Sequence, residues 1–254
     1  MKGKILVLLV ATALLVGVLS GCIEEEKEEE EEVKTEADFE YTSDDMYVGT
    51  VFTFSDKSTG KDLTYEWDFD GDGVVDSTEQ NPTYTFDSAG TYNVKLTITD
   101  GKGTTSESTT DITIILMDIV ATAIDAGFST LATALTTANL VETLQGEGPF
   151  TVFAPTNDAF AAVNQTWLTD LLADTTNLTK VLTYHVLSGE YMSADLTNTS
   201  VETLEGTNVS ITVNSSGVFV NDVIVATADV ECSNGVIHII GEVLIPETVT
   251  GPVD

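Results

Sequence analysis

The sequence contains very few residues of the kinds that build catalytic centres, disulfide frameworks or nucleic-acid-binding surfaces. Its 254 residues include two cysteines, two histidines, nine lysines and no arginine, and its 42 aspartates and glutamates give a formal net charge of −33. A surface with this charge repels phosphate groups, so the sequence predicts no nucleic-acid partner. The excess of carboxylates suits divalent cations or a salty medium, or serves solubility alone.

The scarcity of histidine and cysteine also argues against an enzyme. His185 and His238 both lie in apolar strings (LTYHVLSG and GVIHIIGE), which is typical of structural histidines. The sequence has no nucleophile elbow, glycine-rich phosphate loop, cysteine pair or histidine cluster with metal spacing. Cys232 lies in a strand-like stretch and is expected to be a buried, inert thiol. We therefore expect a non-enzymatic protein without an organic cofactor.

The N-terminus has the features of an export signal. Lys2 and Lys4 precede an apolar run over residues 5–18, which ends in the string LSGC at Cys22. This resembles the lipobox of a prokaryotic surface lipoprotein, and we expect an archaeal one. The resemblance implies a signal peptide over residues 1–21, cleavage before Cys22 and a lipid on its sulfur. The alternative is an uncleaved membrane span of about 19 residues. Both interpretations place the protein at the outer face of the cell membrane.

An acidic segment follows over residues 22–36. Eight glutamates, interrupted only by Lys27, occupy positions 24–32. Like charges at this density repel one another and bury no apolar area, so we expect a disordered, solvated stalk. A dedicated cation-binding tail is the alternative.

Residues 37–115 form a series of short strand patterns separated by turns. Alternating or β-branched strings cover 51–54, 63–67, 83–86, 92–98 and 108–115. Five or more strands at this spacing, with almost no helical pattern, predict a β-sandwich. The strings YEWDFDGDG (65–73), NPTY (81–84) and GTYNV (90–94) resemble the PKD repeat. That resemblance implies an immunoglobulin-like fold that acts as a spacer or binding module.

A possible calcium loop lies inside this domain. The alternating carboxylates, followed by a glycine and two more acidic residues, match the spacing by which EF-hand loops present oxygen ligands. These residues are Asp68, Asp70, Asp72, Asp76 and Glu79. The loop follows a strand and no helix pattern begins at Asp76, so turn geometry is an equally physical explanation of its acidic, glycine-rich composition. The loop is therefore a candidate calcium site, and turn geometry is the alternative explanation of its composition.

Residues 116–248 change to helices followed by strands. Apolar residues recur at helical spacing over 118–144, 167–172 and 178–187, and strand patterns occupy 201–244. This order predicts an α+β domain in which helices cover a sheet. Residues 249–254 form a short tail.

Three segments of this domain carry a specific resemblance. TVFAPTNDAF (151–160) predicts a buried strand and then a helix capped at residues 156–158, and GVIHIIGEVLIP (235–246) predicts a turn and a pair of strands. VLTYHVL (181–187) lies between them. In this order the three segments resemble the fasciclin-like domain, a module used mainly for adhesion outside cells. The resemblance places adhesion on the strand over 235–246 and on the segment around Tyr184 and His185, unless these residues simply build the core. The flanking residues of that segment are Val181, Leu182, Val186 and Leu187. No Asp-Ile pair of the kind associated with integrin binding follows the last segment.

Five Asn-x-Ser/Thr sequons lie in the second domain and none lies in the first. Their asparagines are Asn164, Asn177, Asn198, Asn208 and Asn214. A threonine-rich sequence produces some sequons by chance, so all five are candidate glycosylation sites only.

Taken together, the sequence predicts a lipid-anchored, extracellular adhesion protein. An acidic stalk and a PKD-like spacer would present a fasciclin-like module to a cell-surface or extracellular protein or glycan. Two alternatives remain. One is a surface carrier that holds a lipid, glycan or small solute in a pocket, and the other is a structural component of the cell envelope bridged by calcium.

Overall fold

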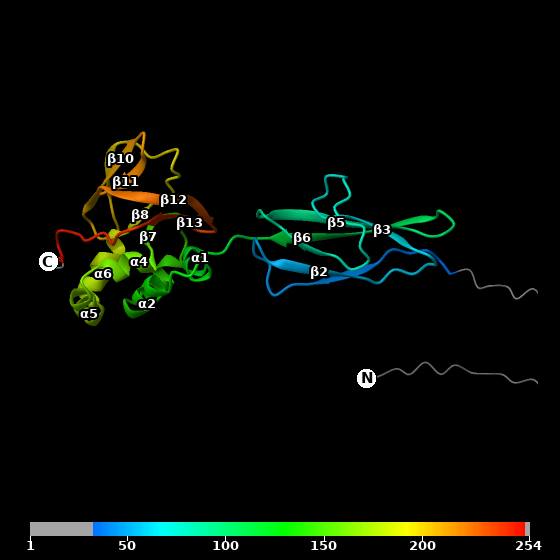
Figure 1. The fold of residues 1–254 in the computed structure, drawn as a ribbon, viewed down its shortest axis with the longest axis horizontal. Helices are drawn as coiled ribbons and strands as arrows, with labels where there is room; N and C mark the ends of the chain where they lie inside the picture. The colour runs from blue at the N-terminus through cyan, green and yellow to red at the C-terminus, as the bar shows by residue number, and fades with distance from the viewer. Residues whose placement is uncertain (1–32, 252–254) are drawn as a thin grey trace, which may run out of the picture.

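The computed structural model describes residues 33–251, which form two domains joined end to end by a short extended segment (Figure 1). The predicted signal peptide, Cys22 and the run of glutamates lie outside the described residues. Within the described part of the chain, no helix combines the length and the apolar character needed to cross a membrane.

The first domain is a sandwich of two three-stranded sheets, as predicted. Its strands are β1 (Phe39–Thr42), β2 (Val51–Asp56), β3 (Thr64–Asp68), β4 (Thr83–Thr85), β5 (Gly90–Thr99) and β6 (Thr105–Ile114). One sheet has the order β1-β2-β4 and the other β3-β5-β6, and all neighbouring strands are antiparallel. Alternation sets the faces: Phe52 and Phe54 of β2 are fully buried, whereas Val51 and Thr53 are exposed.

The core of the sandwich is mainly aromatic. Phe54 packs against Phe69 and Trp67, with ring centroids 4.8 and 5.5 Å away. The indole N–H of the fully buried Trp67 donates to the backbone carbonyl of Glu79 (2.9 Å). This bond satisfies the polar atom of Trp67 and fixes the loop between β3 and β4 to the core.

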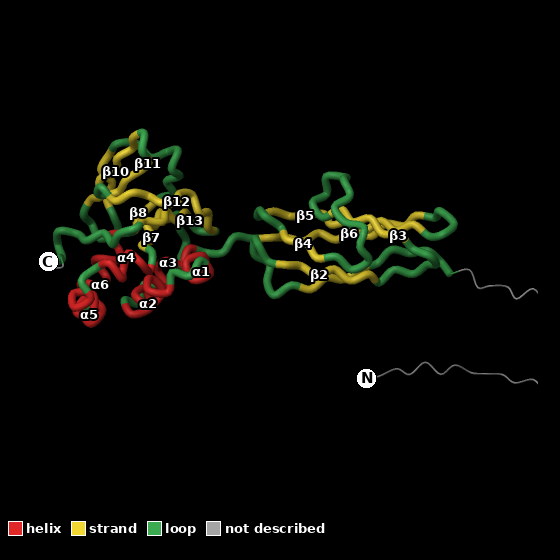
Figure 2. The backbone as a smooth tube through the Cα atoms, in the orientation of Figure 1, coloured by secondary structure: helices red, strands yellow, loops and turns green. Residues whose placement is uncertain are grey.

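The second domain contains six helices and seven strands within the described residues. Its helices are α1 (Ile119–Asp125), α2 (Ser129–Thr137), α3 (Val141–Leu144), α4 (Asn157–Ala162), α5 (Gln165–Ala173) and α6 (Thr175–Tyr184). Its strands are β7 (Phe150–Pro155), β8 (Val186–Ser188), β9 (Thr199–Glu202), β10 (Asn208–Asn214), β11 (Gly217–Val220), β12 (Val223–Cys232) and β13 (Gly235–Ile240). They form one sheet in the order β8-β7-β13-β12-β11-β10-β9. Figure 2 shows the helices on one side of this sheet, so the predicted α+β architecture is confirmed.

The parallel pair β7 and β13 lies between two hydrophobic cores. On β7, Val152 and Ala154 belong to the core beneath the helices. Phe153 points to the other face and joins a second core formed with the curled strands β10 and β11. The segment after β9 returns to β8, since Leu204 N–H donates to the Val186 carbonyl (2.8 Å). The sheet therefore curls around this second core.

Helix starts follow the predicted chemistry. The Thr156 hydroxyl accepts a hydrogen bond from Ala159 N–H (3.1 Å) and caps α4, with Asp158 in the first turn. Asp118 caps α1 in the same way. The helical pattern over 118–144 is divided into three helices, and Gly127 adopts a φ of +80° between α1 and α2.

Two sequence predictions of secondary structure are wrong. The helical pattern over 178–187 ends at Tyr184, and Val186 and Leu187 belong to strand β8. The expected pair of strands over 235–246 is a single strand, β13, followed by a segment that packs its apolar side chains without pairing. In both places apolar side chains pack into the core. A run of apolar residues therefore indicates burial there, but it does not distinguish a helix, a strand or an unpaired segment.

Candidate functional site

The candidate adhesion motif lies in the core of the second domain. The side chains of Tyr184, His185, Val186 and Leu187 expose 6%, 3%, 3% and 0% of their surface. Residues buried to this degree cannot touch a partner. The structure therefore supports the alternative that this motif builds the fold.

His185 holds two distant segments together. Leu244 N–H donates to Nε2 (2.9 Å), which places the ring proton on Nδ1, and this proton is donated to the Val181 carbonyl (2.7 Å). Burial lowers the pKa of His185 to about 4, so the ring is neutral at neutral pH. The imidazole thereby joins the end of α6 to the segment that follows β13.

Tyr184 makes a second connection from the same helix end. Its hydroxyl donates to the Asn208 carbonyl (3.0 Å) and accepts a hydrogen bond from Asn221 Nδ2 (2.7 Å). Asn208 begins β10, and Asn221 lies in the turn between β11 and β12. Adjacent residues of one motif thus fasten α6 to opposite parts of the domain.

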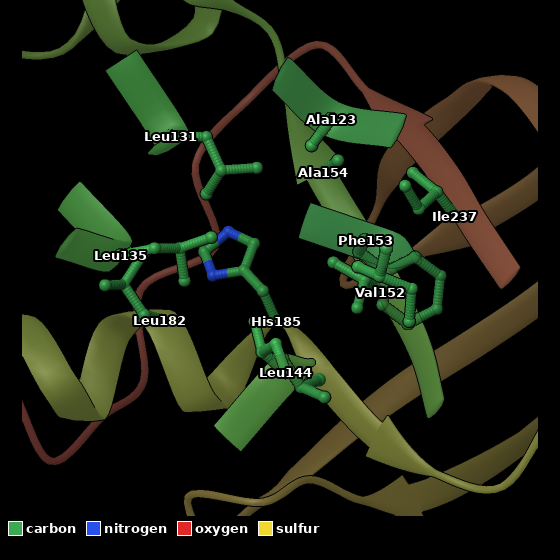
Figure 3. Close-up of a pocket in the computed structure, with 12 residues that line it drawn as sticks. Ala123, Leu131, Leu135, Leu144, Val152, Phe153, Ala154, Leu182, His185 and Ile237 are labelled. Atoms are coloured by element: carbon green, nitrogen blue, oxygen red, sulfur yellow. The ribbon is translucent and has the colours of Figure 1, made fainter. Parts of the chain in front are cut away.

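A small apolar cavity lies beside His185. Leucines of α2 and α6 surround the imidazole there, including Leu131, Leu135 and Leu182 (Figure 3). The cavity measures about 10 Å³, which is the space of a single water molecule. Ligand pockets for small molecules are about thirty times larger or more, so this cavity does not favour a ligand carrier.

The second histidine belongs to a network that the sequence did not predict. His238 is fully buried; its Nδ1 accepts from Asp229 N–H (3.2 Å) and its Nε2–H donates to the Tyr191 carbonyl (2.8 Å). Asp229 accepts hydrogen bonds from both the backbone N–H and the hydroxyl of Ser193. Because Ser193 is bonded to Asp229 and both ring nitrogens of His238 contact backbone, the three residues do not form a nucleophile and base pair.

Asn234 organises the turn before β13. Its Oδ1 accepts from Ile119 N–H (3.0 Å), and its Nδ2 donates to the carbonyls of Leu144 (2.7 Å) and Gly146 (3.1 Å). One side chain thus provides hydrogen-bond partners for a backbone N–H at the start of α1 and for backbone carbonyls at the end of α3. The sequence indicated a turn at Asn234-Gly235 but gave no signal for these partners.

The single cysteine of the described residues lies near this turn. Cys232 is buried, its Sγ lies 3.4 Å from the Thr122 hydroxyl, and burial raises the pKa of its thiol. A raised pKa disfavours the reactive thiolate.

The acidic loop of the first domain brings three of its five candidate carboxylates together. One carboxylate oxygen from each of Asp68, Asp70 and Asp76 lies within 4.8 Å of the other two. Asp72 accepts a hydrogen bond from Val74 N–H (2.7 Å) and is not in this group, and neither is Glu79. Three hard oxygen donors at this spacing are suited to calcium.

The same carboxylates also stabilise the turn. Asp68, which is 5% exposed, accepts from the N–H groups of Gly71 (2.8 Å) and Gly73 (3.0 Å). Asp76 accepts from Phe69 N–H (2.7 Å). Both chemical roles that the sequence suggested for the loop are therefore compatible with its geometry.

The sequon asparagines have different environments. Asn164 caps α5, since its Oδ1 accepts from the N–H groups of Thr166 and Trp167. Asn177 lies in α6 and its Nδ2 donates to Asp174 (2.7 Å). Asn198, Asn208 and Asn214 lie on or beside β9 and β10.

Comparison with known proteins agrees with this architecture. Residues 29–114 match the PKD domain and residues 126–246 match the Fasciclin domain. Protein sll1483 of Synechocystis is 41% identical over 150 residues, which cover 58% of this chain and 82% of that protein. A second Synechocystis protein, the uncharacterized sll1735, is 44% identical over 122 residues, which cover 48% of this chain and 91% of that protein. The chain belongs to the fasciclin domain family.

Two further matches each cover less than half of this chain. The pig transforming growth factor-beta-induced protein ig-h3 is 39% identical over 123 residues, which cover 48% of this chain and 18% of that protein. The PKD1 domain of the Vibrio cholerae metalloprotease PrtV is 32% identical and covers 32% of this chain and 95% of that domain, with a TM-score of 0.28. Family membership supports a surface-interaction role outside the cell in general terms, and both kinds of domain are typically non-enzymatic. These relatives do not bear on an archaeal origin, which stays a prediction.

Proposed function

We propose that the protein is a non-enzymatic adhesion protein, held by a lipid anchor at the outer face of the cell membrane. Its PKD-like sandwich presents the fasciclin domain to an extracellular protein or glycan. The main support is the serial arrangement of two such domains beyond an export-type leader. Both ring nitrogens of His185 and of His238 are hydrogen-bonded, which argues against either ring as a catalytic base. The cavity beside His185 is too small to hold a ligand. Because the Tyr184–Leu187 motif is buried, the contact surface belongs to other, exposed residues of the domain.

Adhesion is tested on whole cells. Cells that display the full chain should bind envelope material from their own species more strongly than cells that display a chain ending at residue 115. The truncated chain keeps the leader, the stalk and the sandwich, so it controls for display and for the charge of these segments. Equal binding by both cell types would contradict the proposal.

The lipid anchor depends on Cys22. Replacing it with alanine removes the sulfur that carries the lipid, so we expect an uncleaved precursor of higher mass that no longer receives the lipid. Mass spectrometry and detergent partitioning measure both effects. Cys232→Ala is the matched control, because it removes the other sulfur and should leave cleavage, the mass of the attached lipid and partitioning as in the wild type. Unchanged partitioning and mass in Cys22→Ala would contradict the lipid anchor.

Calcium binding by the first domain is a second candidate function, and the group formed by Asp68, Asp70 and Asp76 favours it. It would make the sandwich a calcium-dependent element of the cell envelope. Calcium at millimolar concentration should then raise the melting temperature of this domain within the full chain, because a ligand that binds only the folded state stabilises it.

The carboxylates supply a matched pair of variants for this test. Asp70→Asn removes one charge from the group and should abolish the calcium-dependent shift in melting temperature, measured by calorimetry. Asp72→Asn removes the same charge from a neighbouring residue outside the group and should retain the shift. If the wild type shows no shift, the loop serves turn geometry alone.

A further inference from the structure

Strand β10 presents two sequon asparagines on one exposed face. Val209 and Ile211 of this strand are 0% and 1% exposed, so the residues that alternate with them face outward. Asn208 and Asn214 are the first and last residues of β10 and both are exposed. Because their positions differ by six, an even number, their side chains share the outer face.

A third sequon lies beside the same strand. Asn198 immediately precedes β9, which pairs with β10, and its Oδ1 accepts from Val213 N–H (2.6 Å). Asn214 is held similarly, since its Oδ1 accepts from Ser216 N–H (2.7 Å). Each of these bonds uses the oxygen of the side-chain amide and does not involve its nitrogen.

The amide nitrogens distinguish these three asparagines from Asn177. Among residues 33–251, no hydrogen bond involves Nδ2 of Asn198, Asn208 or Asn214. The Nδ2 of Asn177 donates to Asp174, and Asn177 is only half-exposed on α6. The serines two positions after Asn198, Asn208 and Asn214 are exposed as well. The elements of an acceptor site are therefore accessible together at Asn198, Asn208 and Asn214.

We propose that Asn198, Asn208 and Asn214 are N-glycosylated, so that the outer face of β9 and β10 carries oligosaccharides. In the reaction, a bond forms between Nδ2 and the anomeric carbon of a sugar activated on a lipid phosphate. The bond from that carbon to the phosphate oxygen breaks, and the amide proton leaves with the lipid phosphate. The Oδ1 atoms keep their hydrogen bonds. The inference rests on the extracellular location given by the proposed function.

Glycans at these positions would protect the edge of the sheet at β9. Strand β9 is the last strand of the seven-stranded sheet, and only the segment that follows it, at Thr203 and Leu204, meets β8. Residues 199–202 therefore leave one strand edge open, and an open edge is a template for pairing with another chain. Asn208 and Asn214 lie about 20 Å apart along β10 at about 3.4 Å per residue. Glycans at this spacing, together with one beside β9, cover the open edge and leave the opposite, helical side of the domain for contact.

The test uses the full chain purified from the membranes of its own cells. Peptides that contain Asn198, Asn208 or Asn214 should carry hexose-containing masses, and the peptide that contains Asn177 should not. The triple Asn→Gln variant at positions 198, 208 and 214 should lose the whole glycan mass, whereas Asn177→Gln is the matched control and should lose none.

External protease applied to intact cells separates the two proposals. Cleavage of the protein together with unmodified peptides at all three sites would overturn glycosylation and leave the surface location intact. If the protein is also protected from protease, the proposed location fails with it. Modification of Asn177 but not of the three strand asparagines would overturn the argument from amide accessibility.

Discussion

Gly235→Ala is expected to prevent stable folding of the fasciclin domain. Gly235 begins β13, where it lies opposite Phe150 in the parallel pair inside the sheet. A Cβ at this position would lie 2.0 Å from the Phe150 carbonyl oxygen, and the residue has a φ of +147°. Both the clash and the strain involve backbone that cannot move without breaking the pairing. We expect a loss of at least about 4 kcal/mol in the free energy of unfolding, measured by urea denaturation.

Gly217→Ala is the matched control for this substitution. Gly217 has a similar φ of +134° at the start of β11, but an added Cβ meets nothing within 4 Å. Its cost should be limited to backbone strain, about 1–2 kcal/mol. If the two variants are equally stable, the close approach of β13 to β7 does not constrain residue 235.

The strands of the sandwich could be predicted because their local pattern and their burial agree. In β2, alternation alone assigns Phe52 and Phe54 to the core, and the structure places them there. The cap of α4 was predictable for a similar reason, since Thr156 acts on an N–H three residues away. Short-range chemistry of this kind is contained in the sequence.

The helix end at Tyr184 could not be predicted from the same information. Val186 and Leu187 continue the apolar run of α6, and both are buried, so either a helix or a strand would satisfy the pattern. Pairing of β8 with β7 decides the outcome, and this depends on residues about 35 positions earlier.

The candidate sites show the same limit. The spacing of acidic residues selected five carboxylates, but only Asp68, Asp70 and Asp76 converge, because the helix that aims the last ligand of an EF-hand is absent after Asp76 in the described loop. The contact of Ser193 with Asp229 depends on an irregular register between β12 and β13, with Asp229 at a φ of +60°. No local pattern in the sequence encodes such a register.

The second large effect is expected at His185. His185→Ala removes two hydrogen bonds, leaves Leu244 N–H without its acceptor and enlarges the cavity beside the ring. Loss of packing and an unsatisfied buried donor together should lower the free energy of unfolding by about 2–4 kcal/mol. Urea denaturation of the variant measures this loss. A stable variant that has lost adhesion would instead assign a contact role to this residue.

The pH dependence of stability tests the same residue without a substitution. Burial lowers the pKa of His185 from its ordinary value of 6.5 to about 4, so between these values the unfolded chain binds a proton that the folded chain does not. The neutral ring's contribution to the free energy of unfolding is fully present above pH 6.5 and is lost as the pH falls toward 4. At about 1.4 kcal/mol per pH unit, the loss over this range is roughly 3 kcal/mol. Because carboxylates also titrate near the lower limit, NMR should follow the imidazole itself. The His185 resonances should stay those of the neutral ring to about pH 4 while the domain remains folded, and titration near pH 6.5 in the folded protein would contradict its buried, doubly bonded position.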